Sequence, residues 1–112
     1  MPKRHSRLDR VFRALADPTR RAVVRRLALG PRPATALAAR FPMALPSFTQ
    51  HLGVLEHAGL VRSRKRGRVR TYELVPDAVD AARHWLEVQR DLWNTRLDQL
   101  DAHLLTLEES RR

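Results

Sequence analysis

Residues 46–74 constrain the fold more than any other part of the chain. Within them, Phe48, Leu52 and Leu55 recur at i, i+4 and i+7, so that a helix would bury them as one apolar stripe. Gly59 follows where the end of a helix commonly takes a positive φ. The stretch therefore begins with a predicted amphipathic helix that ends near Gly59 and turns a mostly polar face outward.

A β-hairpin is predicted directly after this helix. Residues 61–66 and 69–74 alternate apolar and polar side chains, and Gly67 separates the two runs. A helix with a polar outer face followed by a cationic hairpin suits a winged helix-turn-helix, because the helix can read base edges in a major groove while the hairpin follows the phosphates. The basic residues around the hairpin tip, called the wing cations below, are Arg64, Lys65, Arg66, Arg68 and Arg70.

The same segment resembles the recognition helix and wing of the ArsR/SmtB family of bacterial transcriptional regulators. That family usually shows a Ser or Thr, a polar residue, His-Leu, two residues, a Leu, and then Ala-Gly-Leu-Val. Upstream, residues 12–27 resemble the family's Asp-Pro-Thr-Arg junction between two helices. The resemblance implies a repressor of transcription. The matching residues are Thr49, Gln50, His51, Leu52, Leu55, Ala58, Gly59, Leu60 and Val61, with Gly67, Arg68 and Tyr72 in the wing.

Three helices are predicted before the recognition helix. The first spans residues 8–15, where apolar side chains recur at i, i+3, i+4 and i+7. Asp17 is expected as the N-cap and Pro18 as the first residue of the second helix, and a short third helix spans residues 34–41. The predicted fold class is therefore mostly α with a small β-hairpin, a winged helix-turn-helix of about five helices with a two-stranded wing.

A long C-terminal helix is predicted over residues 76–107, with Pro76 at its first position. Its apolar side chains keep heptad spacing for about three heptads. One small domain has little surface to cover such a stripe, so we expect a second copy of the chain to cover it; the alternative is packing wholly within the monomer. The predicted dimer interface, called the seam below, consists of Leu86, Trp93, Leu97, Leu100, Leu104 and Leu107.

The 112 residues fit one domain. Residues 1–6 are rich in charge and poor in apolar side chains, which predicts a disordered basic arm. The winged helix-turn-helix domain then spans residues 7–112, with a DNA-binding core at 8–75 and a dimerisation helix at 76–107. The N-terminus lacks the apolar core of a signal peptide and no run approaches transmembrane length, so we expect a cytoplasmic protein without membrane contact.

The charge is distributed unevenly. Residues 1–70 contain 17 Lys and Arg against 3 Asp and Glu, whereas residues 71–112 contain 5 against 9. Codon bias is an alternative source of the many arginines, but it does not explain their concentration before residue 70. A basic field of this kind attracts polyanions, which favours double-stranded DNA as the partner. The expected base-reading residues are Ser47, Thr49, Gln50 and His51, and the wing cations are expected to contact the backbone.

Metal sensing and cofactor binding are not predicted. Metal-sensing members of the resembled family carry a Cys-Val-Cys type motif in the third helix, whereas this chain contains no cysteine. Asp101 and His103 begin a second family motif that lacks its later histidine here. A site made by His84 and His103 across an antiparallel dimer remains an alternative, although two isolated imidazoles seldom hold a transition metal.

The sequence also lacks the signatures of an enzyme, namely a glycine-rich phosphate loop, a nucleophile elbow and a metal-ligand cluster. A winged helix that binds another protein is the remaining alternative, because fold does not fix function. The polar recognition helix and the cationic wing favour DNA. The predicted function is thus a sequence-specific regulator, a homodimeric repressor on an inverted-repeat operator, whose inducing signal is left open between a small molecule, a protein partner and its own concentration.

Overall fold

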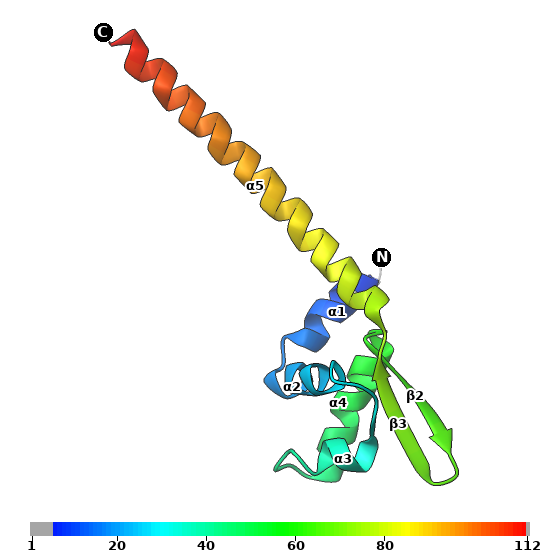
Figure 1. The fold of residues 1–112 in the computed structure, drawn as a ribbon. Coiled ribbons are helices and arrows are strands. Elements are labelled where there is room, and N and C mark those ends of the chain that lie inside the picture. The colour runs from blue at the N-terminus through cyan, green and yellow to red at the C-terminus, as the bar shows by residue number, and fades with distance from the viewer. Residues whose placement is uncertain (1–5, 112) are drawn as a thin grey trace, which may run out of the picture. The chain divides into compact units, whose positions relative to one another are not determined.

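The structure is a computed structural model that describes residues 6–111, and residues 1–5 of the arm predicted at residues 1–6 lie outside this range (Figure 1). The mostly helical fold class is confirmed. The helices and strands, in chain order, are α1 (Arg7–Leu15), α2 (Pro18–Leu27), β1 (Arg32–Pro33), α3 (Ala34–Ala38), α4 (Leu45–His57), β2 (Val61–Arg66), β3 (Val69–Leu74) and α5 (Pro76–Ser110).

The wing belongs to a three-stranded antiparallel sheet with the strand order β1-β3-β2. Strands β2 and β3 have the predicted bounds, and their register runs from Val61 opposite Leu74 to Arg66 opposite Val69. The prediction of two strands is incomplete, because β1 pairs with Tyr72 and Thr71 of β3. A two-residue strand shows no alternation, and its proline restricts it to a sheet edge, so no sequence pattern indicated it.

Helix α4 is built as its apolar spacing predicts. Phe48, Leu52 and Leu55 are buried in the core, where they lie with residues from α1, α2 and the sheet. The helix ends in a Schellman motif, in which the N–H of Leu60 donates to the Leu55 carbonyl and the N–H of Gly59 donates to that of Glu56, both at 3.0 Å. Gly59 has a φ of +77° there, as expected. This motif directs the chain from the recognition helix straight into β2.

The first three helices differ from their predictions only at their ends. Ser6 lies at the edge of the predicted arm, yet it caps α1 by accepting a hydrogen bond from the N–H of Asp9 at 3.1 Å. Helix α3 ends at Ala38 rather than at residue 41. Phe41 nevertheless packs inward, because its ring stacks on Phe48 with the centroids 5.1 Å apart. The residues that follow α3 therefore pack against α4, although the helix itself is shorter than predicted.

Helix α5 is shared by two compact units. The first unit contains the described residues up to Ala82, and Ala78 and Ala82 of α5 are buried in its core. The second unit is the remainder of α5, from Arg83 onward. The six seam residues in this part are 41–61% exposed.

None of the helices within residues 6–111 is long and apolar enough to cross a membrane.

Candidate nucleic-acid interface

The N-terminal half of α4 presents polar side chains to solvent. Ser47, Thr49 and Gln50 are exposed, whereas Phe48 between them is buried. Within residues 6–111 these three polar side chains make no hydrogen bond, so their donors and acceptors are available to a ligand. Three of the four predicted base-reading residues, Ser47, Thr49 and Gln50, therefore face outward without a partner in the described chain.

His51, the fourth predicted base-reading residue, is held by two residues of the junction before α2. Its side chain is 22% exposed. Its Nδ1 atom lies 3.1 Å from a terminal nitrogen of Arg20 and 3.8 Å from Oδ2 of Asp17. His51 is therefore a partly buried member of a cluster that links α4 to the start of α2.

Arg20 connects this cluster to the end of α1. Its Nε donates to the Ala14 carbonyl at 2.7 Å, and its second terminal nitrogen donates to the Arg13 carbonyl at 3.0 Å. These carbonyls belong to the last turn of a helix, where backbone acceptors lack helical partners. The next residue, Arg21, satisfies the carbonyls of Leu15 and Ala16 in the same way. The contact between Arg20 and His51 depends on how α2 packs against α4.

Asp17 is the N-cap of α2, as predicted, and accepts a hydrogen bond from the N–H of Arg20 at 3.0 Å. This hydrogen bond lowers the pKa of Asp17 below its ordinary value of 3.8. Burial opposes this shift, but the charges of His51 and Arg20 add to the effect of the hydrogen bond, and the pKa remains lowered. Asp17 is consequently a carboxylate whose ionised form stabilises both the helix start and its contact with α4.

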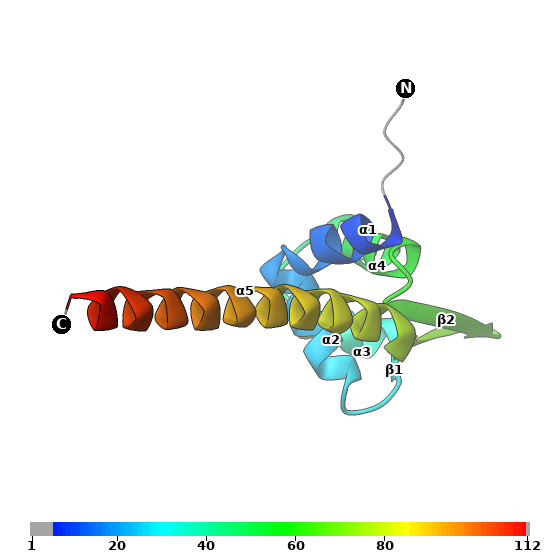
Figure 2. The same cartoon turned by 90° about the horizontal axis from the view of Figure 1, so that it is seen from above.

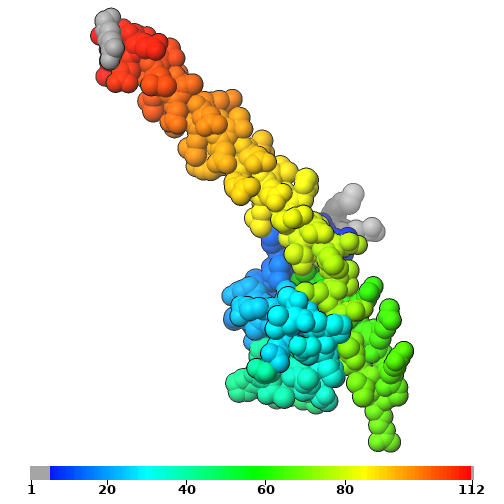
Figure 3. Space-filling model, in the orientation of Figure 1, coloured from blue at the N-terminus to red at the C-terminus, as the bar shows by residue number. Residues whose placement is uncertain are grey.

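The wing carries a dense group of cations on a tight turn. Gly67 has a φ of +59°, and no residue other than glycine within residues 6–111 has a positive φ, which matches a type II′ turn with glycine first and Arg68 second. All five wing cations are exposed, and the space-filling view shows the hairpin extending beyond the helices around it (Figure 3). In the described chain, Arg64, Lys65, Arg66 and Arg68 make no ion pair, whereas Arg62 on the same strand pairs with Glu73.

Arg70, the remaining wing cation, ties the wing to the recognition helix. It donates to the Ser63 hydroxyl at 2.9 Å, and that hydroxyl donates to Oε2 of Glu56 in α4, also at 2.9 Å. Strand alternation places Ser63 and Arg70 on the sheet face that also carries the buried Val61 and Tyr72. The chain of contacts fixes the wing relative to the last turn of α4.

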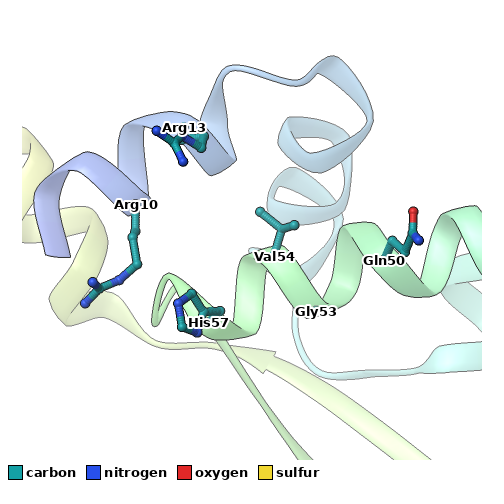
Figure 4. Close-up of a pocket in the computed structure, with 6 residues that line it drawn as sticks. All are labelled: Arg10, Arg13, Gln50, Gly53, Val54 and His57. Carbon is teal, nitrogen blue, oxygen red and sulfur yellow. The ribbon is translucent and has the colours of Figure 1, made fainter. Parts of the chain in front are cut away.

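A groove runs between α4 and α1, which lie side by side (Figure 2). Its volume is about 550 Å³, and its lining residues are labelled in Figure 4. Gln50, Gly53, Val54 and His57 follow one another along the outer side of α4, and Arg10 and Arg13 come from α1. The two arginines add positive charge to the side of the groove that α1 forms. The sequence did not indicate this, because the spacing of residues on one helix does not show which helix lies next to it.

No potential metal centre was found within residues 6–111, since no group of three or more His, Asp or Glu side chains there could hold an ion. His84 and His103 both lie on the second unit. The site therefore consists of the polar start of α4, the cationic wing and the junction that holds His51.

Comparison with known proteins agrees with this geometry. A family model described as a helix-turn-helix domain matches residues 15–64. The HTH-type transcriptional regulator Rv2034 of Mycobacterium tuberculosis is 48% identical over 75 residues, which cover 67% of this chain and 70% of that protein. The transcriptional repressor SdpR of Bacillus subtilis is 29% identical over 79 residues, covering 70% of this chain and 88% of SdpR.

Solved structures identify the family. An ArsR family transcriptional regulator is 47% identical, with a TM-score of 0.77, and the match covers 80% of this chain and 98% of that one. The chain belongs to the ArsR family. Another match, 31% identical with a TM-score of 0.60, is the homodimeric winged helix-turn-helix DNA-binding domain of a protein from Mycobacterium bovis described as a possible ArsR-family transcriptional regulator. This match covers 77% of this chain and 78% of that domain. As an ArsR-family member with a helix-turn-helix domain, this chain is a DNA-binding transcriptional regulator.

Proposed function

We propose that this ArsR-family regulator is a homodimeric repressor that binds an inverted-repeat operator in promoter DNA. One observation carries the proposal: the exposed polar start of α4 and the unpaired cations of the wing lie on one compact unit. The Glu56–Ser63–Arg70 contacts hold these two surfaces in a fixed relation. A duplex that receives α4 in its major groove would therefore meet the wing at its backbone.

The polar start of α4 and the cationic wing have different functions in this proposal. The amide of Gln50 can form a bidentate pair with adenine N6 and N7, which is worth about 1–3 kcal/mol against a wrong base. Ser47 and Thr49 offer hydroxyl groups that can donate or accept. Arg66 and Arg68 flank the wing turn, and each phosphate that such a cation neutralises releases about one counterion. We infer that α4 supplies sequence preference and that the wing supplies affinity for any duplex.

Dimerisation would present two such surfaces to an inverted repeat. From Trp93 to Leu107 the seam runs without interruption at i, i+4, i+7, i+11 and i+14, and its side chains are about half exposed. A second copy of α5 would remove this apolar stripe from water. The homodimer of the M. bovis domain supports such an assembly, and the similarity to the transcriptional repressor SdpR supports repression.

The experiment is a selection of bound duplexes from a random-sequence library, followed by footprinting on the DNA that flanks the protein's own gene. The expected result is one enriched motif made of two inverted half-sites about one helical turn apart, protected at the same place in the footprint. A library that yields no enriched sequence, or a single half-site bound by one copy, would contradict the proposal.

A further inference from the structure

The surroundings of His51 decide which of its ring nitrogens carries the proton. A guanidinium group has N–H donors and no acceptor. Because a terminal nitrogen of Arg20 lies 3.1 Å from Nδ1 of His51, that atom must accept, and the proton of the neutral ring must be on Nε2. Asp17 does not reverse this assignment. Its Oδ2 is 3.8 Å away, beyond hydrogen-bond distance, and a proton on Nδ1 would face the Arg20 donor.

The Nε2 atom of His51 is available to a ligand. Both recorded contacts of this side chain use Nδ1, so Nε2 has no hydrogen-bond partner within residues 6–111. The Nε2 atom is also not buried from solvent. His51 directly follows Gln50 on α4, in the half of the helix that the proposed function places in the major groove.

Arg20 is itself held firmly. Its other two nitrogens donate to the carbonyls of Ala14 and Arg13, and its backbone N–H donates to the cap residue Asp17. The guanidinium is planar, so two bonds to fixed backbone acceptors define where the third donor points. The position of His51 is therefore set from the end of α1 and the start of α2 rather than by α4 alone.

We propose that Arg20 is a positioning residue for DNA recognition, which holds His51 in the Nε2–H tautomer so that α4 presents a fixed hydrogen-bond donor to an acceptor on DNA. This inference rests on the proposed function for the identity of the ligand. The acceptor is either a base edge in the major groove, such as purine N7, guanine O6 or thymine O4, or a phosphate oxygen. The tautomer itself can be tested without DNA.

The first test is NMR spectroscopy of the full chain labelled with 15N-histidine, at a pH where the ring is neutral. The His51 signals are assigned by their loss in His51→Asn. We expect an unprotonated Nδ1 and a protonated Nε2 in the wild type. In Arg20→Lys the ring should become a mixture of tautomers. A proton on Nδ1, or a tautomer mixture in the wild type, would overturn the inference.

The second test uses two substitutions that each retain one end of the imidazole. The amide oxygen of Asn can take the place of Nδ1 and accept from Arg20, but Asn has no group at Nε2. Gln reaches the place of Nε2 with an N–H donor. For the selected operator we expect His51→Asn to lose about threefold to tenfold in affinity and His51→Gln to stay within about twofold. A loss confined to the operator indicates a base acceptor, and an equal loss on random duplex indicates a phosphate.

Arg21 provides the control for Arg20. Both arginines hold the end of α1, but only Arg20 contacts His51. We expect Arg20→Lys to reduce operator affinity about as much as His51→Asn does, and Arg21→Lys to leave it unchanged, with thermal unfolding recorded for both. If Arg20→Lys and His51→Asn both remain folded and bind the operator with wild-type affinity, this inference alone is wrong. A wild type that prefers no duplex would instead defeat the proposed function.

Discussion

At the scale of single residues, Asp17 is the side chain on which the junction between α1, α2 and α4 depends. Its carboxylate caps α2 through the N–H of Arg20 and lies beside His51. The lowered pKa of Asp17 means that its ionised form is bound more favourably in the folded protein than in the unfolded chain. Asp17 therefore contributes stability above the pKa of the unfolded chain.

This contribution is lost as the pH falls through the folded pKa, which lies below 3.8. We expect the free energy of unfolding of the wild type to decline more steeply below about pH 4 than that of Asp17→Asn, because Asn still caps the helix but does not titrate. Denaturant unfolding at a series of pH values from 7 to 2.5 measures both. Parallel acid curves for the two proteins would exclude Asp17 as a source of the decline.

At the scale of the elements, the local signals in the sequence were sufficient for α4, β2 and β3. The positive φ of Gly59 and Gly67, the cap at Asp17 and the buried stripe from Phe48 to Leu55 all follow from a few neighbouring residues. Strand β1, the groove and the contact between Arg20 and His51 were not predicted, because each depends on packing between segments distant in the sequence. Because α2 lies beside α4, His51 has contacts within the chain. The other predicted base-reading residues remain without partners in the described chain.

Two glycines allow a matched test of backbone conformation within these elements. A methyl group at Gly53 or at Gly67 would meet no atom within 4 Å, but Gly53 is helical whereas Gly67 has a φ of +59°. We expect Gly53→Ala to raise the free energy of unfolding by about 0.5–1 kcal/mol and Gly67→Ala to lower it by about 1–2 kcal/mol. Urea unfolding followed by circular dichroism gives both values. Changes of the same sign would show that the turn does not require the left-handed conformation.

At the scale of the whole molecule, the exposed seam of α5 predicts that the chain is a dimer. Leu100→Glu should place a charge without a partner in the interface and weaken association by about 3–5 kcal/mol. Leu105→Glu is the control, because Leu105 is 61% exposed on the same helix but lies off the seam. Sedimentation at micromolar concentration should show monomers for the first variant and dimers for the second. Dimers for both would place the interface elsewhere.

Metal ions should not control this assembly or its binding to DNA. The chain has no cysteine, and no metal-ligand group was found in the described part. Zinc, cadmium or arsenite in modest excess is therefore expected to leave operator affinity unchanged. Stoichiometric zinc binding that releases the operator would contradict this and would direct attention to His84 and His103.

The central claim is that α4 recognises the sequence while the wing holds the backbone, and binding across a salt series tests it most directly. Four proteins are each titrated with the selected operator and with random duplex: the wild type, Gln50→Ala, Arg68→Ala and a control. The control is Arg25→Ala, which removes a charge from α2. Gln50→Ala should lower the ratio of operator to random affinity by about fivefold to a hundredfold and leave the salt slope unchanged. Arg68→Ala should reduce the slope by about 1 and largely spare the ratio, and Arg25→Ala should change neither. The claim is contradicted if Gln50→Ala and Arg68→Ala have the same effect, or if their effects are exchanged.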